Sequence, residues 1–256
     1  MNIAIDVMGG DYAPKAVIDG IIESINLLTN HETILAIGPE DVINSLFKSR
    51  NFSSTQVRVV HADQVIEMGE HPTKALSQKP NSSIGIGFSL LKEGKADVFA
   101  SAGNTGAMMV GSLFSVKTIH GIQRPAIAGF VPQVDGHYAI MLDIGANADC
   151  KPEMLAQWAE LGSIYFESTT GKSNPRVGLM NIGEEEQKGS ILAQGTHALL
   201  KENSHIKFIG NIEGKDLFRN KADVIVTDGF TGNIVLKMGE SIYNIMKEQG
   251  MMNEFV

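Results

Sequence analysis

A regular alternation along this chain constrains its fold more than any other feature of the sequence. Short runs rich in Val and Ile alternate with longer segments whose apolar residues recur at helical spacing. The short runs predict strands at residues 2–7, 33–37, 57–61, 97–101, 126–131, 138–143, 176–181, 206–210 and 223–227. The longer segments predict helices at residues 14–28, 39–48, 82–92, 105–119, 152–166, 189–201 and 231–247. Continuous apolar strands between helices are typical of a mostly parallel sheet, so we expect an α/β fold with helices on both faces.

One pair of expected strands departs from the parallel pattern. The strands at 126–131 and 138–143 are separated by a short segment that contains Asp135-Gly136, and an Asp-Gly pair is a strong hairpin signal. We therefore expect one antiparallel hairpin. No Ser- or Pro-rich linker divides the chain, so residues 1–256 are expected to form a single catalytic unit or two closely packed subdomains.

Charge, cysteine content and hydropathy exclude several classes of protein. The net charge is −8, whereas a general nucleic-acid binder is normally basic. Cys150 is the lone cysteine, which excludes an internal disulfide and a cysteine-rich zinc site and fits a reducing cytoplasm. The start of the chain has no basic region of a signal peptide, and the apolar run at 107–116 is far shorter than the ~20 residues that cross a bilayer. We expect a cytoplasmic protein that attaches at most to a membrane surface.

Small and polar residues follow six of the expected strands. These loops lie at residues 6–11, 101–106, 143–149, 181–185, 210–214 and 228–233. In an open α/β sheet the carboxyl ends of the strands form the crevice where ligands bind, and a following helix N-terminus offers N–H groups to an anion. No loop is a Walker A motif or a Gly-x-Gly-x-x-Gly motif after a strand, so a nucleotide is not indicated. The sequence therefore predicts a binding crevice built from several loops.

Two of these loops resemble each other. Gly103, Thr105 and Gly106 follow Ala96-Asp97-Val98 at the same offsets at which Gly229, Thr231 and Gly232 follow Ala222-Asp223-Val224. Taken alone, a loop of this kind is as consistent with a purely structural role as with ligand binding. In a strand–turn–helix unit glycines allow the chain to turn and Thr caps the helix.

The acidic residues of the loops have alternative roles. Glu184, Glu185 and Glu186 precede an expected helix and would stabilise its N-terminal dipole as well as act in a site. Asp residues at strand ends bind Mg²⁺, cap loops or accept protons. Cys150 has no His partner nearby in sequence, so we do not expect it to be a nucleophile.

In combination and in order, these loops carry a family resemblance. The segments at 6–11, 101–106, 143–147 and 228–233, with Arg124-Pro125-Ala126, Glu184-Glu185 and Lys188-Gly189, resemble the bacterial acyl-ACP:phosphate acyltransferases, which start phospholipid synthesis. The resemblance implies an isocitrate/isopropylmalate dehydrogenase-like fold, also seen in phosphotransacetylases. It implies acyl-ACP and inorganic phosphate as substrates, no metal and no cofactor. It further implies a cytoplasmic homodimer that works beside a membrane glycerol-3-phosphate acyltransferase. The family continues into another glycine-rich segment after the long helix, and residues 1–256 do not include it; either the chain is shortened or that segment lies outside this sequence.

The resemblance and the loop chemistry together select the candidate site residues. Neutral amides suit a developing oxyanion, and helix N-termini suit phosphate. The expected catalytic residues are Asn104, Asn147, Glu184, Glu185, Lys188 and Asn233. The expected phosphate- and substrate-binding residues are Asp6, Gly9, Gly10, Asp11, Ser101, Gly103, Thr105, Gly106, Asp143, Asn181, Asp228, Gly229, Thr231 and Gly232.

Two other functions remain open at this point. A metal- and NAD-dependent decarboxylating dehydrogenase shares the fold, but it would need an Arg-rich pocket, and few arginines lie near these loops. A non-catalytic recruiter at the membrane surface is the other alternative.

We also expect Lys215, Arg219 and Lys221 to offer a basic patch to the acidic carrier protein, or else to form a solvated face. The apolar residues at 250–256 are expected to contact a second subunit, a bilayer or further chain.

Overall fold

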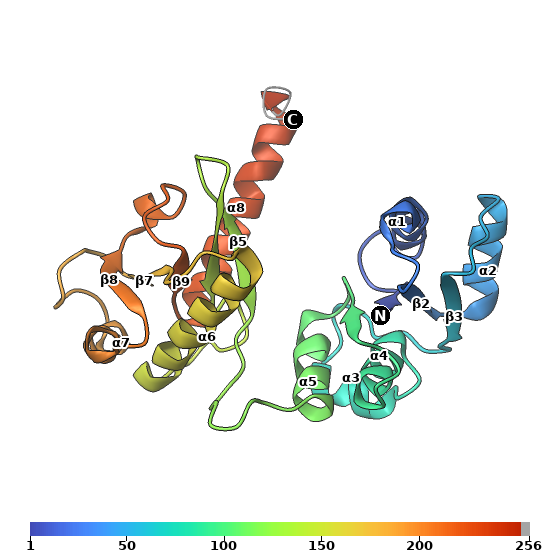
Figure 1. Ribbon diagram of the computed structural model, residues 1–256, viewed down its shortest axis with the longest axis horizontal. Coiled ribbons are helices and arrows are strands. Elements are labelled where there is room, and N and C mark those ends of the chain that lie inside the picture. The colour runs from blue at the N-terminus through green and yellow to red at the C-terminus, as the bar shows by residue number, and fades with distance from the viewer. Residues whose placement is uncertain (252–256) are drawn as a thin grey trace. The chain divides into compact units, whose positions relative to one another are not determined.

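The computed structural model describes residues 1–251, and the chain divides into two compact units, Met1–Thr118 and Ile119–Val256. Figure 1 draws the first unit from blue to green and the second from green to red. Each unit builds its own sheet, one of four strands and one of five. The expected α/β class, with mostly parallel strands covered by helices, is confirmed; the strands divide between two sheets.

The first unit holds a fully parallel sheet. Its strands are β1 (Asn2–Asp6), β2 (Thr33–Gly38), β3 (Val57–His61) and β4 (Val98–Ala100), in the order β3-β2-β1-β4. Its helices are α1 (Lys15–Ser24) with the 3₁₀ turn η1 (Ile25–Leu27), α2 (Glu40–Ser49), α3 (Pro72–Gln78), α4 (Ser83–Lys92) and α5 (Thr105–Ser115). Successive side chains of β2 alternate between the two faces: Ile34 and Ala36 pack on α1 and α2, whereas Leu35 and Ile37 pack toward α4. Burial on both faces explains why this strand reads as a continuous apolar run.

The second unit holds a mixed sheet in the order β5-β6-β9-β7-β8. Its strands are β5 (Ala128–Pro132), β6 (Tyr138–Leu142), β7 (Arg176–Met180), β8 (Lys207–Ile212) and β9 (Val224–Val226). Its helices are α6 (Pro152–Thr170), α7 (Ile191–Glu202) and α8 (Gly229–Glu248), with the 3₁₀ turn η2 (Gly214–Asp216). Strands β5 and β6 pair antiparallel, with Val131 opposite Ala139, so the predicted hairpin is confirmed. The remaining pairs are parallel, which brings the loops after β6, β9, β7 and β8 to one edge.

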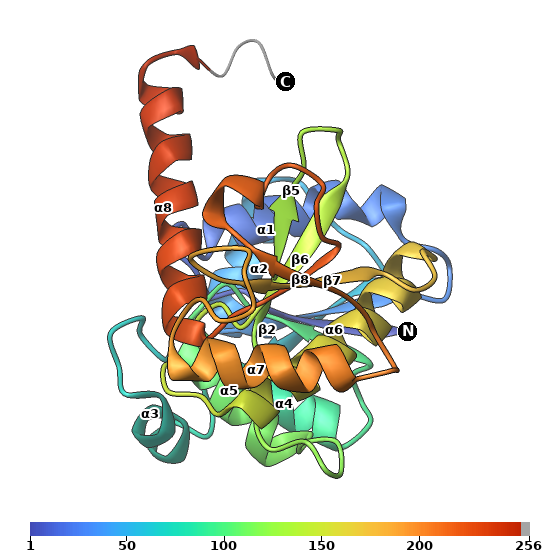
Figure 2. The same cartoon turned by 90° about the vertical axis from the view of Figure 1, so that its left-hand side faces the viewer.

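Both faces of the second sheet are also buried. Ile140 and Leu142 pack with Trp158 of α6 on one face, where Trp158 is fully buried. Met141 and Ile225 pack on the opposite face with Leu217 and with Val235 of α8. Helix α8 is seen along its length in Figure 2. Within residues 1–251 no helix is both long enough and apolar enough to span a bilayer.

Several helix ends differ from the sequence-based expectation, and two of the differences have a clear local cause. Helix α3 was not predicted, because it is only seven residues long and its one buried residue is Ala75; Pro72 at its first turn is the signal that points to it. Helix α8 begins at Gly229 rather than at residue 231, because the carboxylate of Asp228 caps it by accepting from the backbone N–H of Thr231 at 2.8 Å. In the related loop Asn104 is the cap, so in neither loop does Thr cap the helix.

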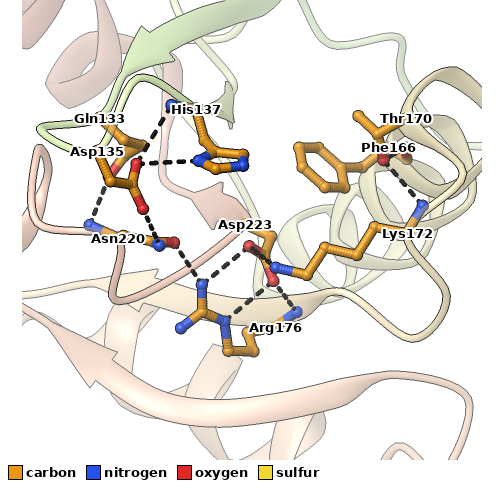
Figure 3. A network of polar contacts seen from close by, with 9 residues as sticks. All are labelled: Gln133, Asp135, His137, Phe166, Thr170, Lys172, Arg176, Asn220 and Asp223. Atoms are coloured by element: carbon orange, nitrogen blue, oxygen red, sulfur yellow. Dashed lines mark hydrogen bonds and ion pairs between the residues drawn. The ribbon is translucent and has the colours of Figure 1, made fainter.

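A polar network links β7 to β9 at the amino ends of these strands, opposite the edge that holds the loops after β6, β9, β7 and β8. The buried carboxylate of Asp223 accepts from the side chains of Lys172, at 2.7 Å, and Arg176, at 3.0 Å (Figure 3). Arg176 also donates to Asn220, which in turn contacts Asp135 of the hairpin turn. Burial by itself raises the pKa of Asp223, but the hydrogen bonds from Arg176 and Lys172 outweigh it and bring the pKa to about 2.

This lowered pKa predicts a loss of stability in acid. A carboxyl whose pKa is about 2 in the folded protein and 3.8 ordinarily contributes its stability above about pH 4 and loses it as the pH falls through 2. The shift corresponds to about 2 kcal/mol of unfolding free energy. We expect Asp223→Asn to unfold at lower urea than the wild type at pH 7, and the difference to shrink toward pH 2. A difference that stays constant from pH 7 to pH 2 would remove Asp223 as its source.

Candidate functional site

In the first unit the predicted site residues lie at the carboxyl ends of the neighbouring strands β1 and β4. The buried carboxylate of Asp6 accepts from the hydroxyl of Ser101 at 2.7 Å, and that hydroxyl accepts from the N–H of Gly103 at 3.0 Å. A Cβ on Gly9 would lie 2.7 Å from both the Asp6 carboxylate and the Gly103 nitrogen. Asp6, Gly9, Ser101 and Gly103 therefore form one closely packed pair of loops, and Gly9 has no room for a side chain.

Asn104 occupies the start of α5 with its side chain fully engaged. Its Oδ1 accepts from the N–H of Ala107 at 2.9 Å and caps the helix. Its amide donates to the carbonyls of Glu67, Met68 and Glu70 at 3.0 to 3.1 Å. Asn104 thus holds the 67–70 loop against α5, so it acts here as a positioning residue. A direct contact of Asn104 with substrate stays a prediction.

The remaining predicted residues of the first unit are less constrained. Asp11 and Thr105 are exposed, and Gly10 has a φ of +103°, which favours glycine. A Cβ on Gly106 would lie 2.4 Å from the Pro72 ring, so the start of α5 and the start of α3 approach each other closely.

In the second unit Asp143 organises the loop that follows β6. Its fully buried Oδ1 accepts from the N–H groups of Ile127, Gly145 and Ala146 at 3.0 to 3.2 Å. Its Oδ2 accepts from the N–H and the side-chain amide of Asn147 at 2.7 and 2.9 Å. These five hydrogen bonds satisfy both oxygens of the buried side chain. Asp143 therefore shapes the 143–147 loop from within.

The two predicted asparagines beside this loop differ in freedom. Asn147 is buried, and its side-chain amide donates both hydrogens, one to the carboxylate of Asp143 and one to the carbonyl of Pro125 at 2.8 Å. Asn233 is exposed on the first turns of α8, close to the backbone of Gly145, and within residues 1–251 its amide has no hydrogen-bond partner. Of these two amides, only that of Asn233 has a donor available for a ligand.

The start of α8 presses directly against the 143–147 loop. The N–H of Gly229 donates to the carbonyl of Asn147 at 2.8 Å. A Cβ on Gly229 would lie 2.7 Å from the Asp143 carboxylate, and one on Gly232 would lie 1.9 Å from the Asp143 carbonyl oxygen. Both glycines are needed because helix and loop share this space.

A cavity of about 360 Å³ lies where strands β7 and β9 end. It brings together three of the predicted binding residues, Asn181, Asp228 and Thr231. It also includes Gly189 and Ser190, which we did not select as site residues from the sequence. Ser190 caps α7 by accepting from the N–H of Ala193 at 3.2 Å, so the N-termini of α7 and α8 both border the cavity. The two helix N-termini favour an anionic ligand in this cavity, whereas the carboxylate of Asp228, which also lines it, opposes one.

Asn181 and Gly189 hold the loop that closes this cavity. The amide of Asn181 donates to the carbonyl of Lys188 at 3.1 Å, and its Oδ1 accepts from the N–H of Ile182 at 2.8 Å. Gly189 has a φ of +91°, and a Cβ there would lie 2.3 Å from the Asn181 Oδ1. The sequence signal for this feature is Gly189-Ser190, a glycine before a capping serine.

The predicted glutamates lie on the outer side of the same loop. Glu184 is exposed and pairs with Lys221 at 2.7 Å, and the hydrogen bond from Lys221 lowers the pKa of Glu184. Glu185 and Lys188 are exposed, and the carbonyl of Glu185 accepts from Asn211 at 2.9 Å. A carboxylate with a lowered pKa is a poor proton acceptor near pH 7, so Glu184 fits an ion pair better than a general base. Its catalytic role stays a prediction.

Acidic side chains lie beside the lysines of the expected basic patch. In the expected basic patch, Lys221 pairs with Asp216 as well as Glu184, and Lys215 pairs with Glu213 at 3.1 Å, so acidic neighbours offset much of its charge. The apolar segment at 250–256 falls mostly outside the described residues, because the description ends at Met251.

Known proteins resemble this chain over nearly its whole length. A family model described as "Fatty acid synthesis protein" matches residues 1–255. The "Phosphate acyltransferase" of Dictyoglomus turgidum is 46% identical over 242 residues, which are 94% of this chain and 71% of the relative. The protein of the same name from Bacillus subtilis is 46% identical over 252 residues, which are 97% of this chain and 74% of the relative.

Solved structures show the same fold at low identity. A phosphotransacetylase from Streptococcus pyogenes has a TM-score of 0.66 at 15% identity and covers 98% of this chain and 82% of its own. The EutD phosphotransacetylase from Staphylococcus aureus has a TM-score of 0.65 at 18% identity, with 94% and 82% covered. A 4-hydroxythreonine-4-phosphate dehydrogenase from Burkholderia phymatum has a TM-score of 0.51 at 13% identity, with 88% and 78% covered.

Proposed function

This chain belongs to the phosphate acyltransferase family, and from that premise we propose that it transfers a fatty acyl group from acyl carrier protein to inorganic phosphate. The reaction is acyl-S-ACP plus phosphate to acyl phosphate plus ACP thiol, and it is the first step toward phosphatidic acid. The observation that carries this proposal is the family match over residues 1–255. The cavity at the N-termini of α7 and α8 supports it, because helix N-termini offer N–H groups to an anion.

The proposed chemistry is direct attack. Phosphate near pH 7 is already partly a dianion, so it needs orientation more than deprotonation. A phosphate oxygen forms a bond to the thioester carbonyl carbon, the carbon–sulfur bond breaks, and the carrier leaves as a thiolate that takes a proton from solvent. Helix N-termini orient the phosphate, and the available amide of Asn233 donates to the developing oxyanion. Asp143, Asn147 and Asn181 hold the loops in place.

The function is tested by measuring free carrier thiol. We expect thiol release from acyl-ACP only when phosphate is present, at a rate that saturates with phosphate, and more slowly when acyl-CoA is the donor. Thiol release that is independent of phosphate would instead indicate a thioesterase and overturn the proposal. Formation of acyl phosphate, trapped as a hydroxamate, checks that the acyl group reached phosphate.

Direct attack predicts that Cys150→Ala retains most of the activity. Cys150 is the lone thiol; burial raises its pKa, and its Sγ lies 3.2 Å from the carbonyl of Asn147. A thiol with a raised pKa is a poor nucleophile at pH 7. We expect kcat within about threefold of the wild type, since the reaction forms no acyl-enzyme. An acyl group found on Cys150 by mass spectrometry would reverse this assignment.

We further propose that the protein works as a cytoplasmic homodimer beside a membrane glycerol-3-phosphate acyltransferase. Acyl phosphate is lipophilic and hydrolysable, so transfer at the membrane surface limits its loss to water. Ile234, Met238 and Ile245 support a subunit contact, because they form an exposed apolar stripe along one face of α8. Sedimentation of the wild type tests the dimer.

A further inference from the structure

An apolar groove runs along α8 in the second unit, on a different face from the stripe formed by Ile234, Met238 and Ile245. The groove has a volume of about 650 Å³, which is the size of a small-molecule site. One wall is α8 and the other is the β5–β6 hairpin, which lies beside α8 in Figure 1. The residues of α8 that line it are Val235, Leu236, Gly239, Glu240, Ile242, Tyr243 and Met246.

One end of the groove lies next to two of the predicted site residues. Ile144 lines it and directly follows Asp143, the residue that organises the 143–147 loop. Val235 lines the same end and lies two residues after Asn233, the proposed oxyanion donor. Ile144 and Val235 also belong to one apolar cluster with Met141. A ligand that reacts beside Asn233 therefore has this apolar groove next to it within the same unit.

The lining suits a hydrocarbon. Apart from Glu240, every side chain in the groove is apolar or aromatic, and the Glu240 carboxylate is half exposed and pairs with Lys237 at 2.8 Å. From Val235 to Met246 the helix rises about 16 Å at ~1.5 Å per residue. An extended alkyl chain advances roughly 1.25 Å per methylene, given a C–C bond of ~1.52 Å, so this length holds about thirteen methylenes.

From these observations we infer that the groove between α8 and the β5–β6 hairpin binds the acyl chain of the substrate, with the thioester end at Ile144 and the methyl end toward Met246. This inference rests on the proposed function, because it assumes a fatty acyl donor. The groove then sets the preferred chain length, since its extent along α8 decides how many methylenes leave water. Each buried methylene contributes roughly fourfold in affinity.

Gly239→Phe tests the inference by blocking the groove. Gly239 lines the middle of the groove, and a Cβ there meets no atom within 4 Å, so the ring is expected to enter the groove without disturbing the fold. We expect kcat/KM to fall at least about 100-fold for a sixteen-carbon acyl-ACP, which is the loss of three to four methylene contacts, and to change less than about threefold for a four-carbon donor. Asn244→Phe is the matched control, because it adds the same ring at an exposed residue of α8 outside the groove.

A second pair of variants does not depend on packing a ring. Tyr243→Asp places a charge in the groove, and Asn244→Asp places the same charge one residue away, outside it. Only the first is expected to disfavour the long chain. Equal losses for long and short donors, or unchanged chain-length preference in both groove variants, would overturn the inference. A shift from dimer to monomer with unchanged chain-length preference would assign the groove to a second subunit and overturn it as well.

Direct binding separates this inference from the proposed function. The probe is cis-parinaric acid, a fluorescent eighteen-carbon fatty acid, titrated into the wild type and the four variants. Binding that Gly239→Phe and Tyr243→Asp weaken at least tenfold, but the two Asn244 variants do not, supports the groove even if no acyl-ACP turnover is found. Equal binding by all five proteins, together with chain-length-independent turnover, refutes the groove while leaving the acyltransferase function intact.

Discussion

Asp143→Asn is expected to destabilise the second unit by at least about 3 kcal/mol. The buried Oδ2 of Asp143 accepts two hydrogen bonds from Asn147, and hydrogen bonds to a charged group contribute about 1.5–3 kcal/mol each. In Asp143→Asn an NH₂ group replaces one carboxylate oxygen. In one orientation this NH₂ group faces the two donors of Asn147, and in the flipped orientation it faces the N–H groups of Ile127, Gly145 and Ala146. Either way a donor faces donors. Urea denaturation at pH 7, followed by the fluorescence of Trp158 in α6, measures the loss.

Asp149→Asn provides the matched control. Asp149 lies near the same loop, but it is exposed, so removing its charge should change stability by no more than about 0.5 kcal/mol. If Asp143→Asn unfolds at the same urea concentration as this control, Asp143 does not organise the loop. The activity of Asp143→Asn, measured at urea concentrations well below its unfolding transition, then reports whether the 143–147 loop keeps its shape while the protein stays folded.

Gly232→Ala is expected to lower both activity and stability. An added Cβ would lie 1.9 Å from the Asp143 carbonyl oxygen, which is a backbone atom, so the start of α8 must move away from the 143–147 loop. Overpacking of this kind costs about 1–3 kcal/mol. Because Asn233 moves with the helix, and a displacement of ~1 Å commonly costs about 100-fold in rate, we expect kcat to fall by at least that factor.

Gly20→Ala separates this clash from the general effect of replacing a helical glycine. Gly20 lies inside α1, where an added Cβ meets no atom within 4 Å, and alanine in a helix is more stable than glycine by roughly 0.5–1 kcal/mol. This variant should therefore melt at or above the wild-type temperature with unchanged kcat. Full activity of Gly232→Ala would show that the start of α8 can move away from the 143–147 loop without loss of function. It would also contradict the proposed role of Asn233 as a donor to the oxyanion.

The sequence by itself determined most of the local structure of this protein, although it did not reveal helix α3. All nine expected strands are present, because short Val- and Ile-rich runs between turn residues leave few alternatives. The hairpin at Asp135-Gly136 and the loops after β1, β4, β6, β7, β8 and β9 were likewise predicted, because their signals lie within a few residues of one another.

The tertiary structure alone decided how those strands divide and what the loop side chains do. Strand order depends on pairing between segments far apart in the chain, such as β6 with β9, and no local pattern encodes it. Asn104, Asn147 and Asn233 look alike as amides in glycine-rich loops, yet each of the first two donates to a carbonyl at least 22 residues away along the chain, and Asn147 also donates to the nearby Asp143. The same holds for Glu184, whose partner Lys221 lies 37 residues away. An amide or carboxylate is available for chemistry only if no distant group has already bonded it, and that is a property of the folded chain.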